Sequence, residues 1–196
     1  MLPELGLILL AAGRGTRFGA EPKLLQPLAG RPLVRHAAEA ALASGLGPVV
    51  AVFGAHAERV GAALDGLDLV RVVNPAYADG LATSLQAGLA ALPATVGGAI
   101  VLLGDMPRVS ARHLTELADA FRRADPAPSA VVPIHAGRRG NPVLLNLGLL
   151  GPVLAGLSGD QGAGRLLAGR ADVLECPMDA GVSLDVDTPD GLAALR

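Results

Sequence analysis

Aromatic residues are nearly missing from this chain: of 196 residues, three are Phe, one is Tyr and none is Trp. A core without aromatic rings must be built from Leu, Val and Ala, and the hydrophobic share of 51% supplies enough of them. The same scarcity removes the rings on which single-stranded nucleic-acid binders stack bases. We therefore expect no nucleic-acid partner.

Charge of either sign is also sparse, and it is nearly balanced. Sixteen basic side chains stand against 18 acidic ones, which leaves a formal net charge of −2 and a pI of about 6.1. A nucleic-acid-binding face requires a basic patch that this balance does not provide. Any binding of anions must come from a local group of residues.

Cysteine and long apolar runs are the remaining shortages. The single Cys176 permits no internal disulfide, and its neighbours Glu175 and Pro177 offer no base or cation that would activate the thiol. No apolar stretch approaches the roughly 20 residues of a membrane span, and residues 2–10 lack the basic start of a signal peptide. We expect a cytoplasmic protein with no membrane partner and with Cys176 as a structural thiol.

What the chain does have is a regular alternation of two kinds of segment. Apolar runs suited to buried parallel strands alternate with patterns typical of helices. The predicted strands are 5–10, 49–53, 69–73, 99–103 and 130–133, and the predicted helices are 32–44, 57–64, 81–92 and 111–124. This alternation predicts one α/β domain over residues 1–196, a three-layer sandwich with a mostly parallel, Rossmann-like sheet. Residues 142–146 (PVLLN) read as a further strand outside the alternation.

A glycine-rich, basic turn follows the first predicted strand, within the segment LLAAGRGTRFGAEPK at residues 9–23. Glycines let a backbone approach a ligand closely, and the N–H groups of such a turn can cradle an anion. Arg14, Arg17 and Lys23 add positive charge. The turn predicts a site for a nucleoside triphosphate, as in nucleotidyltransferases. The alternative is an ordinary strand-to-helix turn with surface arginines.

Two commoner glycine loops do not match this turn. The P-loop pattern needs a Gly-Lys-Ser/Thr ending, which follows neither Gly15 nor Gly19. The dinucleotide fingerprint fails because Phe18 stands where its third glycine belongs. The turn is therefore neither a P-loop nor a Rossmann dinucleotide site.

A carboxylate, Asp105, directly follows the predicted strand 99–103 and its glycine. Ligands of open parallel sheets bind at the carboxyl ends of strands, so this position belongs to the same edge as the glycine turn. A carboxylate there is costly unless it is paired or binds a metal, and Mg²⁺ on a triphosphate takes one or two carboxylates. We expect Asp105 to hold Mg²⁺. The alternative is an Asp that caps a turn or a helix.

Two further carboxylates, Asp185 and Asp187, lie near the end of the sequence. Alternate residues of an extended segment point to opposite faces, so only one of them is expected to face the metal. Asp187 could equally cap the last helix, because Thr188 and Pro189 follow it.

Segments spread over nearly the whole chain carry a resemblance to a known family. They are LAAGRGTRFG, PKLL, GRPL, NPAYADGLATSL, LLGDMP, GRRGNPVLL, GDQGAG and LDVDTPDGL. Together they resemble the molybdenum cofactor cytidylyltransferase group of the MobA-like nucleotidyltransferases. The Ala-Ala-Gly opening at residues 11–13 is similar to the cytidylyl branch, whereas the guanylyl branch usually shows Leu-Ala-Gly-Gly. The resemblance implies an α/β fold of the nucleotide-diphospho-sugar transferase type.

The reaction that this resemblance implies is the transfer of CMP from CTP to the phosphate of molybdenum-loaded molybdopterin, with release of pyrophosphate. The cofactor would be Mg²⁺. The partners would be CTP, a molybdopterin-type acceptor, and a molybdenum hydroxylase or its chaperone.

The resemblance also implies functions for particular residues. Arg17, Lys23 and Asp105 would be catalytic, and Asp105 and Asp187 would hold the metal. The nucleotide would bind to residues of the opening motif and of the segment near residue 80, namely Leu10, Ala11, Ala12, Gly13, Gly15, Lys23, Gly80 and Ser84. One departure is that Gly164 stands where the family often has an arginine, and Arg165 follows it. On a helix that shift rotates the side chain by about 100°.

A basic loop at residues 137–141 follows the fifth predicted strand and His135. We expect this loop to lie over the pterin phosphate, with Arg139 or Asn141 in contact. A solvated basic loop is the alternative. The other histidines, His36, His56 and His113, fall in helical patterns and are expected at the surface or between helices.

Three other functions remain compatible with these residues. The first is a nucleotidyltransferase for a different phosphorylated acceptor, such as a sugar phosphate. The second is a non-catalytic chaperone that binds a nucleotide or pterin and serves a molybdenum hydroxylase. The third is a redox enzyme built on the same scaffold.

Overall fold

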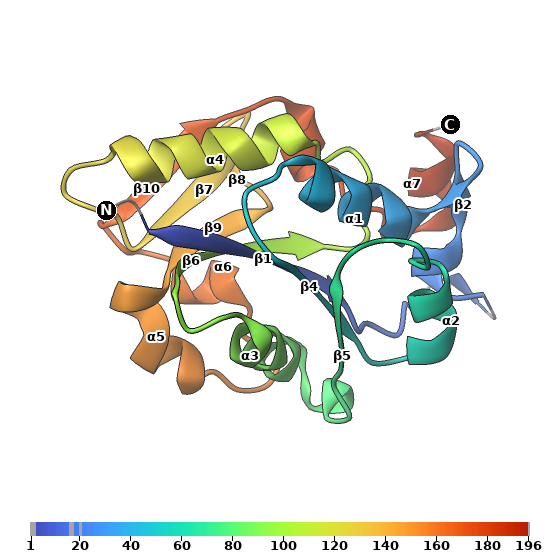
Figure 1. Ribbon diagram of the computed structural model, residues 1–196. Coiled ribbons are helices and arrows are strands. Elements are labelled where there is room, and N and C mark those ends of the chain that lie inside the picture. The colour runs from blue at the N-terminus through green and yellow to red at the C-terminus, as the bar shows by residue number, and fades with distance from the viewer. Residues whose placement is uncertain (1–2, 16–17, 20, 196) are drawn as a thin grey trace.

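One twisted sheet runs through the computed structural model, which describes residues 3–15, 18–19 and 21–195. Its strands are β1 (Glu4–Ala11), β4 (Val49–Phe53), β5 (Val70–Val73), β6 (Val96–Leu103), β7 (Ala130–His135), β8 (Arg138–Arg139), β9 (Val143–Asn146) and β10 (Val173–Pro177). They are arranged in the order β10-β7-β9-β6-β1-β4-β5, and β8 pairs with β7 (Figure 1). A separate small hairpin is formed by β2 (Pro27–Leu28) and β3 (Arg31–Pro32).

Helices cover both faces of this sheet. The α-helices are α1 (Leu33–Ala43), α2 (Ala57–Ala62), α3 (Leu81–Ala91), α4 (Ala111–Arg123), α5 (Leu147–Ala155), α6 (Ala163–Leu166) and α7 (Pro189–Ala193). Short 3-10 turns lie at η2 (Lys23–Leu25), η3 (Tyr77–Asp79) and η4 (Ala180–Ser183). In Figure 1, α1 and α4 lie on one side of the sheet, whereas α3, α5 and α6 lie on the other. The three-layer α/β sandwich expected from the alternation is confirmed.

The sheet is mostly parallel but not wholly so. β1 pairs in parallel with both β4 and β6, and β4 pairs in parallel with β5. β9 lies between β6 and β7 and runs antiparallel to both. This strand lies within the segment PVLLN, which falls outside the alternation. Because β9 is antiparallel to both of its neighbours, β7 runs in the same direction as β6, and β10 runs parallel to β7.

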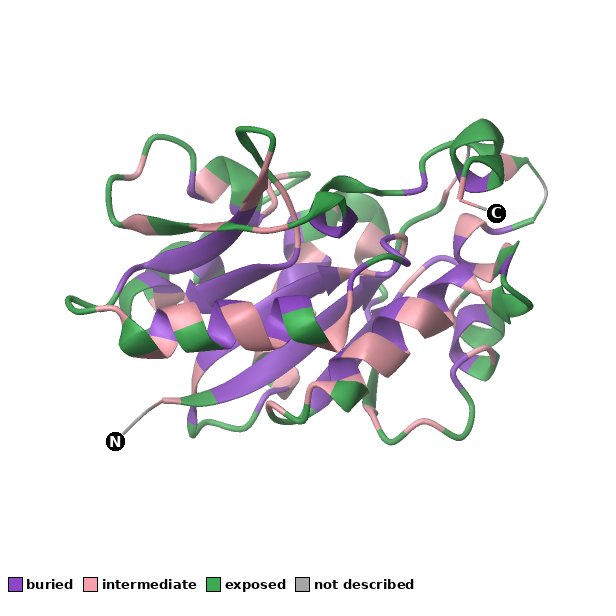
Figure 2. Ribbon diagram, turned by 90° about the horizontal axis from the view of Figure 1, so that it is seen from above, coloured by how far each residue is buried: buried purple, intermediate pink, exposed green. Residues whose placement is uncertain are grey.

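Two apolar layers stabilise the sandwich, and β1 contributes to both. Leu5, Leu7 and Leu9 pack with α1 and α4, whereas Ile8 and Leu10 pack with α3 on the opposite face. This alternation follows from the pleat, which points successive side chains to opposite faces. Figure 2 shows the strands buried beneath helices whose outer faces are exposed.

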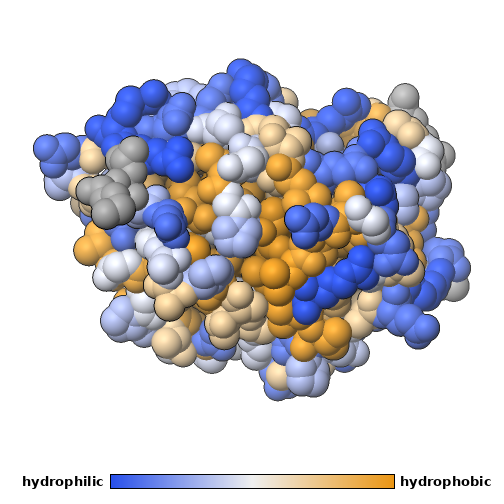
Figure 3. Space-filling model, viewed as in Figure 1, coloured by the Kyte–Doolittle hydropathy of each residue, from blue (hydrophilic) through white to orange (hydrophobic). Residues whose placement is uncertain are grey.

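Apolar side chains also reach the surface at the edge strand β5, where Val70 is 48% and Val73 is 62% exposed. Figure 3 shows hydrophobic surface beside α3 and β5. Within the described ranges, each helix is too short or too polar to cross a bilayer.

The central strands bring distant loops to one edge of the sheet. β1 and β6 run in parallel with Leu10 opposite Leu103, so the turn after β1 and the turn after β6 emerge side by side. The N–H of Gly104 donates to the Leu10 carbonyl at 3.0 Å and extends this pairing past the end of β6. The predicted glycine turn and the predicted carboxylate therefore become neighbours.

Candidate active site

A cavity of about 420 Å³ opens at this edge, beyond the carboxyl ends of β1 and β6. Its walls come from the glycine turn, η2, the residues around the start of α3, and the end of β6. Seven of the eight residues expected at the nucleotide line it, together with Asp105: they are Leu10, Ala12, Gly13, Gly15, Lys23, Gly80 and Ser84.

Gly15 shapes the turn that closes one end of the cavity. Its φ is +58°, and a Cβ at this position would lie 2.7 Å from Cβ of Lys23. Only glycine combines that backbone conformation with so close an approach. The turn therefore folds directly over Lys23. Arg17, the predicted catalytic arginine of this turn, lies outside the described residues.

The exposed guanidinium of Arg14 lies over the ring of Tyr77, with 5.7 Å between its central carbon and the ring centroid. That distance falls within the range of about 6 Å over which a cation is attracted to an aromatic face. Both residues line the cavity, so a cation is held at its wall. Sequence reasoning missed Tyr77. The signal was available, because this is the one tyrosine of a chain almost without aromatics.

The ammonium of Lys23 lies between two carboxylates, and one of them, Asp105, lines the cavity together with Lys23. Its Nζ is 2.5 Å from Oδ2 of Asp105 and 3.1 Å from Oδ1 of Asp187. Burial disfavours the charge of Lys23, but Asp105 and then Asp187 outweigh it, so the pKa of Lys23 is raised above its ordinary value of 10.5. The side chain stays cationic at neutral pH.

The backbone holds the two carboxylates together. The N–H of Val186, one residue before Asp187, donates to the Asp105 carbonyl at 3.0 Å. Asp187, rather than Asp185, is thus the member of the C-terminal acidic motif that contacts Lys23. Asp185 is exposed.

Asp105 and Asp187 are the residues that could hold a divalent cation here. The Oδ1 atom of Asp105 is buried and has no hydrogen-bond partner among the described residues, so an oxygen is available to a ligand. No cluster of three or more Asp, Glu, His or Cys occurs in the described part of the chain. Two carboxylates suit Mg²⁺, which binds one or two of them and completes its shell with phosphate oxygens and water. The donor set fits.

Asn74, buried at the end of β5, orders the wall of the cavity that carries Ser84. Its Nδ2 donates to Oγ of Ser84 at 3.0 Å and to Oγ1 of Thr83 at 2.9 Å. Its Oδ1 accepts from the N–H of Ala76 at 3.0 Å. The amide thus joins the turn after β5 to the first turn of α3, and it fixes Ser84 from behind.

A loop from a distant part of the chain completes this wall. Gly80 has φ +117°, and a Cβ there would lie 2.2 Å from the carbonyl carbon of Gly159. The Gly159 carbonyl accepts from the N–H of Ala82 at 3.0 Å, and the next residue, Asp160, lines the cavity. Sequence reasoning did not single out Asp160, although the segment GDQGAG that carries it contributes to the resemblance.

Comparison with known proteins identifies the family of this chain. The family model described as the MobA-like NTP transferase domain matches residues 7–174. The chain belongs to this family. Its fold is of the nucleotide-diphospho-sugar transferase type, as the sequence predicts.

Relatives of this MobA-like chain match it over almost its full length. The crystal structure of Rv0371c from Mycobacterium tuberculosis H37Rv is 31% identical, covers 100% of this chain and 98% of that one, and has a TM-score of 0.85. A structure of the same protein in complex with manganese is 32% identical, with coverage of 98% and 97% and a TM-score of 0.79. Nicotine blue oxidoreductase from Paenarthrobacter nicotinovorans is 35% identical over 99% of this chain and 97% of its own length.

The predicted acceptor residues Arg139 and Asn141 line a second cavity of about 250 Å³. It shares Leu10, Leu81 and Leu103 with the first cavity, so the two are adjacent. Arg139 is partly engaged, because its Nε donates to Glu175 at 2.8 Å and its Nη1 to the Leu167 carbonyl at 2.9 Å. Asn141 and Arg139 therefore line a space beside the first cavity.

Two residues that the sequence raised, Ala11 and Arg165, lie away from both cavities of this MobA-like fold. The side chain of Ala11 is 1% exposed and packs in the core between the sheet and α1. Its backbone ends β1 opposite Phe53. Arg165 is exposed on α6 and lines neither cavity, whereas Gly164, which stands at the family's arginine position, lines the second.

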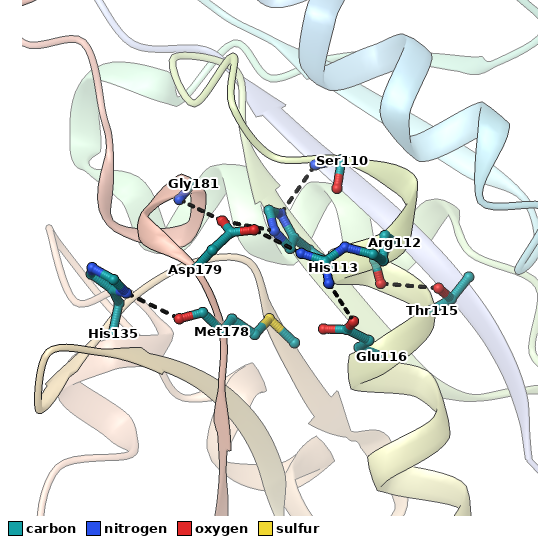
Figure 4. A network of polar contacts seen from close by, with 9 residues as sticks. All are labelled: Ser110, Arg112, His113, Thr115, Glu116, His135, Met178, Asp179 and Gly181. Carbon is teal, nitrogen blue, oxygen red and sulfur yellow. Dashed lines mark hydrogen bonds and ion pairs between the residues drawn. The ribbon is translucent and has the colours of Figure 1, made fainter.

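A polar network connects α4 to the C-terminal segment (Figure 4). His113 is buried rather than at the surface; its Nδ1 accepts from the N–H of Ser110, and its Nε2 lies 3.1 Å from Oδ1 of Asp179. Arg112 donates to Oδ2 of Asp179 at 2.7 Å. His135 contacts the Met178 carbonyl through Nδ1 at 3.0 Å. His113 and His135 thus anchor residues 178–179, which precede Asp187 in the C-terminal segment.

Cys176 is half-buried in β10, and burial followed by the charge of Glu116 raises the pKa of its thiol. A raised pKa keeps the thiol protonated and unreactive at neutral pH.

Proposed function

We propose that this protein is a Mg²⁺-dependent nucleotidyltransferase that joins CMP from CTP to the phosphate of molybdenum-loaded molybdopterin and releases pyrophosphate. The observation that carries the proposal is the contact of Lys23 with Asp105 and Asp187 beside the glycine turn. A triphosphate bound at the glycine turn would lie beside this cation, and the two carboxylates in contact with it would hold the metal. The choice of CTP and of the pterin acceptor rests on the Ala11-Ala12-Gly13 opening and the other family segments.

The reaction needs no general base from the protein. The terminal phosphate of the acceptor has a second pKa of about 6, so it is largely dianionic at neutral pH. One of its oxygens attacks the α-phosphorus, the bond from that phosphorus to the bridging oxygen breaks, and pyrophosphate leaves with the bonding electrons. Catalysis then consists of in-line positioning and neutralisation of charge.

Residues of this chain have separate parts in that positioning. The N–H groups around Gly13 and Gly15 would bind the leaving phosphates, and Lys23 would neutralise charge near the α-phosphate. Arg17 would assist at the leaving pyrophosphate. Asp105 and Asp187 would hold Mg²⁺, which when bound neutralises phosphate charge. Arg139 and Asn141 would bind the acceptor from the adjacent cavity.

The decisive experiment is a pyrophosphate-release assay with Mg²⁺ and each of the four ribonucleoside triphosphates, with and without loaded molybdopterin. We expect release with CTP only when the acceptor is present. Asp105→Asn should lower the rate by about 10²–10³-fold, the usual cost of removing one electrostatic contact to the transition state. Asp185→Asn is the matched control, because Asp185 is an exposed carboxylate of the same acidic motif as Asp187, and Lys23 contacts Asp187 instead.

Full activity of folded Asp105→Asn would refute the assigned metal site. Tight binding of CTP or pterin without pyrophosphate release would instead favour the chaperone. Release with another phosphorylated acceptor would keep the activity and change the substrate.

A second candidate is an oxidoreductase, and the name of the relative nicotine blue oxidoreductase favours it. The same cavity would then bind a dinucleotide without the usual glycine fingerprint. An assay for oxidation of NADH or NADPH tests this candidate. The reduced nucleotide is mixed with the protein and an oxidised aromatic dye, and the loss of the nucleotide's absorbance is measured. No oxidation under conditions that give CTP-dependent pyrophosphate release would exclude it.

A further inference from the structure

The ammonium of Lys23 lies between the two carboxylates, at the position that a divalent cation bound to both of them would occupy. Its side chain is 14% exposed, and those of Asp105 and Asp187 are 19% and 51% exposed. The three residues come from η2, the end of β6 and the segment before α7, separated by 82 and 164 positions from Lys23. Their meeting is a product of the fold.

The backbone around this contact restricts it to small movements. The Gln26 N–H donates to the Lys23 carbonyl at 3.1 Å, which closes the turn of η2. Gly15 lies against Cβ of Lys23, and the Val186 N–H is bonded to the Asp105 carbonyl. Rotation of the Lys23 side chain alone would take the ammonium off the carboxylates, without movement of either loop.

A bound anion would offer the ammonium an alternative partner in the rest of the cavity. Apart from Lys23 and Asp105, the polar side chains of the lining are those of Arg14, Tyr77, Ser84 and Asp160, and the carboxylates in contact with the ammonium are those of Asp105 and Asp187. A polyphosphate in the glycine turn would supply oxygens toward which Lys23 could swing. The carboxylates would then be released to a metal.

We propose that Lys23 is a built-in counter-ion that competes with the divalent cation for Asp105 and Asp187, so that metal and nucleotide bind cooperatively. The inference rests on the proposed function, because it takes these carboxylates as the metal site. It predicts weak metal binding to the free protein and strong binding once a polyphosphate accepts the ammonium. By linkage, the metal must strengthen nucleotide binding by the same factor.

Binding of Mn²⁺ alone, measured by electron paramagnetic resonance of the free ion, tests the competition without any catalytic readout. Lys23→Met should bind Mn²⁺ at least about tenfold more tightly than the wild type, because it removes the competitor. Lys23→Arg keeps a cation and should stay within about threefold of the wild type.

A change in general electrostatics needs its own control, since Lys23→Met also removes a positive charge from the cavity. Arg14→Met removes a charge from the same cavity without touching the carboxylates. We expect it to change the Mn²⁺ affinity by less than about threefold. Equal gains for Lys23→Met and Arg14→Met would overturn the competition.

Two failures are distinguishable in this experiment. Equal Mn²⁺ affinity of the wild type and Lys23→Met, lost in both on adding Asp105→Asn, would overturn the inference and leave the metal site intact. Absence of any Mn²⁺ binding that depends on Asp105, in every variant, would instead overturn the metal site of the proposed function. Circular dichroism confirms that each variant is folded.

Discussion

Gly80 shows how one missing side chain shapes the first cavity. Its backbone lies at φ +117° and ψ 174°, a region that residues with a Cβ rarely enter. The backbone of Gly159 occupies the space into which a Cβ would point. The loop at Gly159, which carries Asp160 to the cavity, can therefore lie here only because Gly80 has no Cβ.

Gly80→Ala should push the loop at Gly159 away and weaken its hydrogen bond to Ala82. We expect a loss of about 1–3 kcal/mol of stability, seen as a lower midpoint in thermal unfolding, and roughly tenfold weaker nucleotide binding by calorimetry. Gly66→Ala is the control, because Gly66 also has a positive φ, +81°, but open space around it. Nucleotide affinity should be unchanged in Gly66→Ala, and an equal loss in both variants would contradict the close approach.

At the scale of elements, α4 and the segment around η4 are joined by a buried histidine and a carboxylate. The carboxylate of Asp179 accepts from the N–H of Gly181 at 2.8 Å and meets His113 and Arg112 (Figure 4). These contacts lower the pKa of Asp179 below its ordinary value of 3.8, with the Gly181 hydrogen bond first and His113 next. The same segment leads to Asp187, so these contacts anchor the chain that carries Asp187 to Lys23.

A carboxylate with a lowered pKa stabilises the fold above its unfolded-state pKa and loses that contribution as the pH falls through its folded-state pKa. Asp179→Asn should therefore lower the midpoint of thermal unfolding at pH 6. The difference from the wild type should shrink as the pH falls below 3.8. Asp119 is the control: it lies on α4, and its carboxylate forms a 3.9 Å ion pair with Arg123 of the same helix. Asp119→Asn should change the midpoint little at pH 6. A difference for Asp179→Asn that persists unchanged at low pH would contradict this role of the Asp179 contacts.

At the scale of the whole molecule, a ligand in the cavity should stabilise the entire fold, because the lining comes from segments spread between Leu10 and Asp160. A ligand that binds only the folded state at 100 times its Kd adds about 2.7 kcal/mol of stability. For a chain of this size each kcal/mol raises the midpoint by about 2–4 °C.

CTP with Mg²⁺ should accordingly raise the midpoint by roughly 5–11 °C at that concentration. Mg²⁺ alone should raise it little, because the ammonium of Lys23 already contacts both carboxylates. Differential scanning calorimetry with all four nucleotides makes the measurement. Equal shifts for every nucleotide would refute the preference for cytosine, and a large shift with Mg²⁺ alone would contradict the competition by Lys23.

The local pattern of the sequence was sufficient for the first four helices, for most strands and for the edge of the sheet at which polar residues gather, whereas it gave no range for α5, α6 or β10. Apolar runs and helical periodicity are properties of neighbouring residues, so β1, β4, β6, α3 and α4 follow from short stretches. The glycine turn and Asp105 follow from the same stretches, because parallel strands end at a common edge. Their functions stay predictions that the experiments above address.

Only the tertiary structure decided which distant groups touch. Nothing local reverses β9 between β6 and β7, chooses Asp187 over Asp185, or brings Gly159 against Gly80. The sequence by itself determined most of the elements before residue 147 and the chemical character of their ends, because both depend on residues close together in the chain. Pairing of strands and contact of charges 82 or 164 positions apart depend instead on how both faces of the sheet are packed. The contact of Lys23 with its two carboxylates is the clearest case, since three separate loops must be in place before it exists.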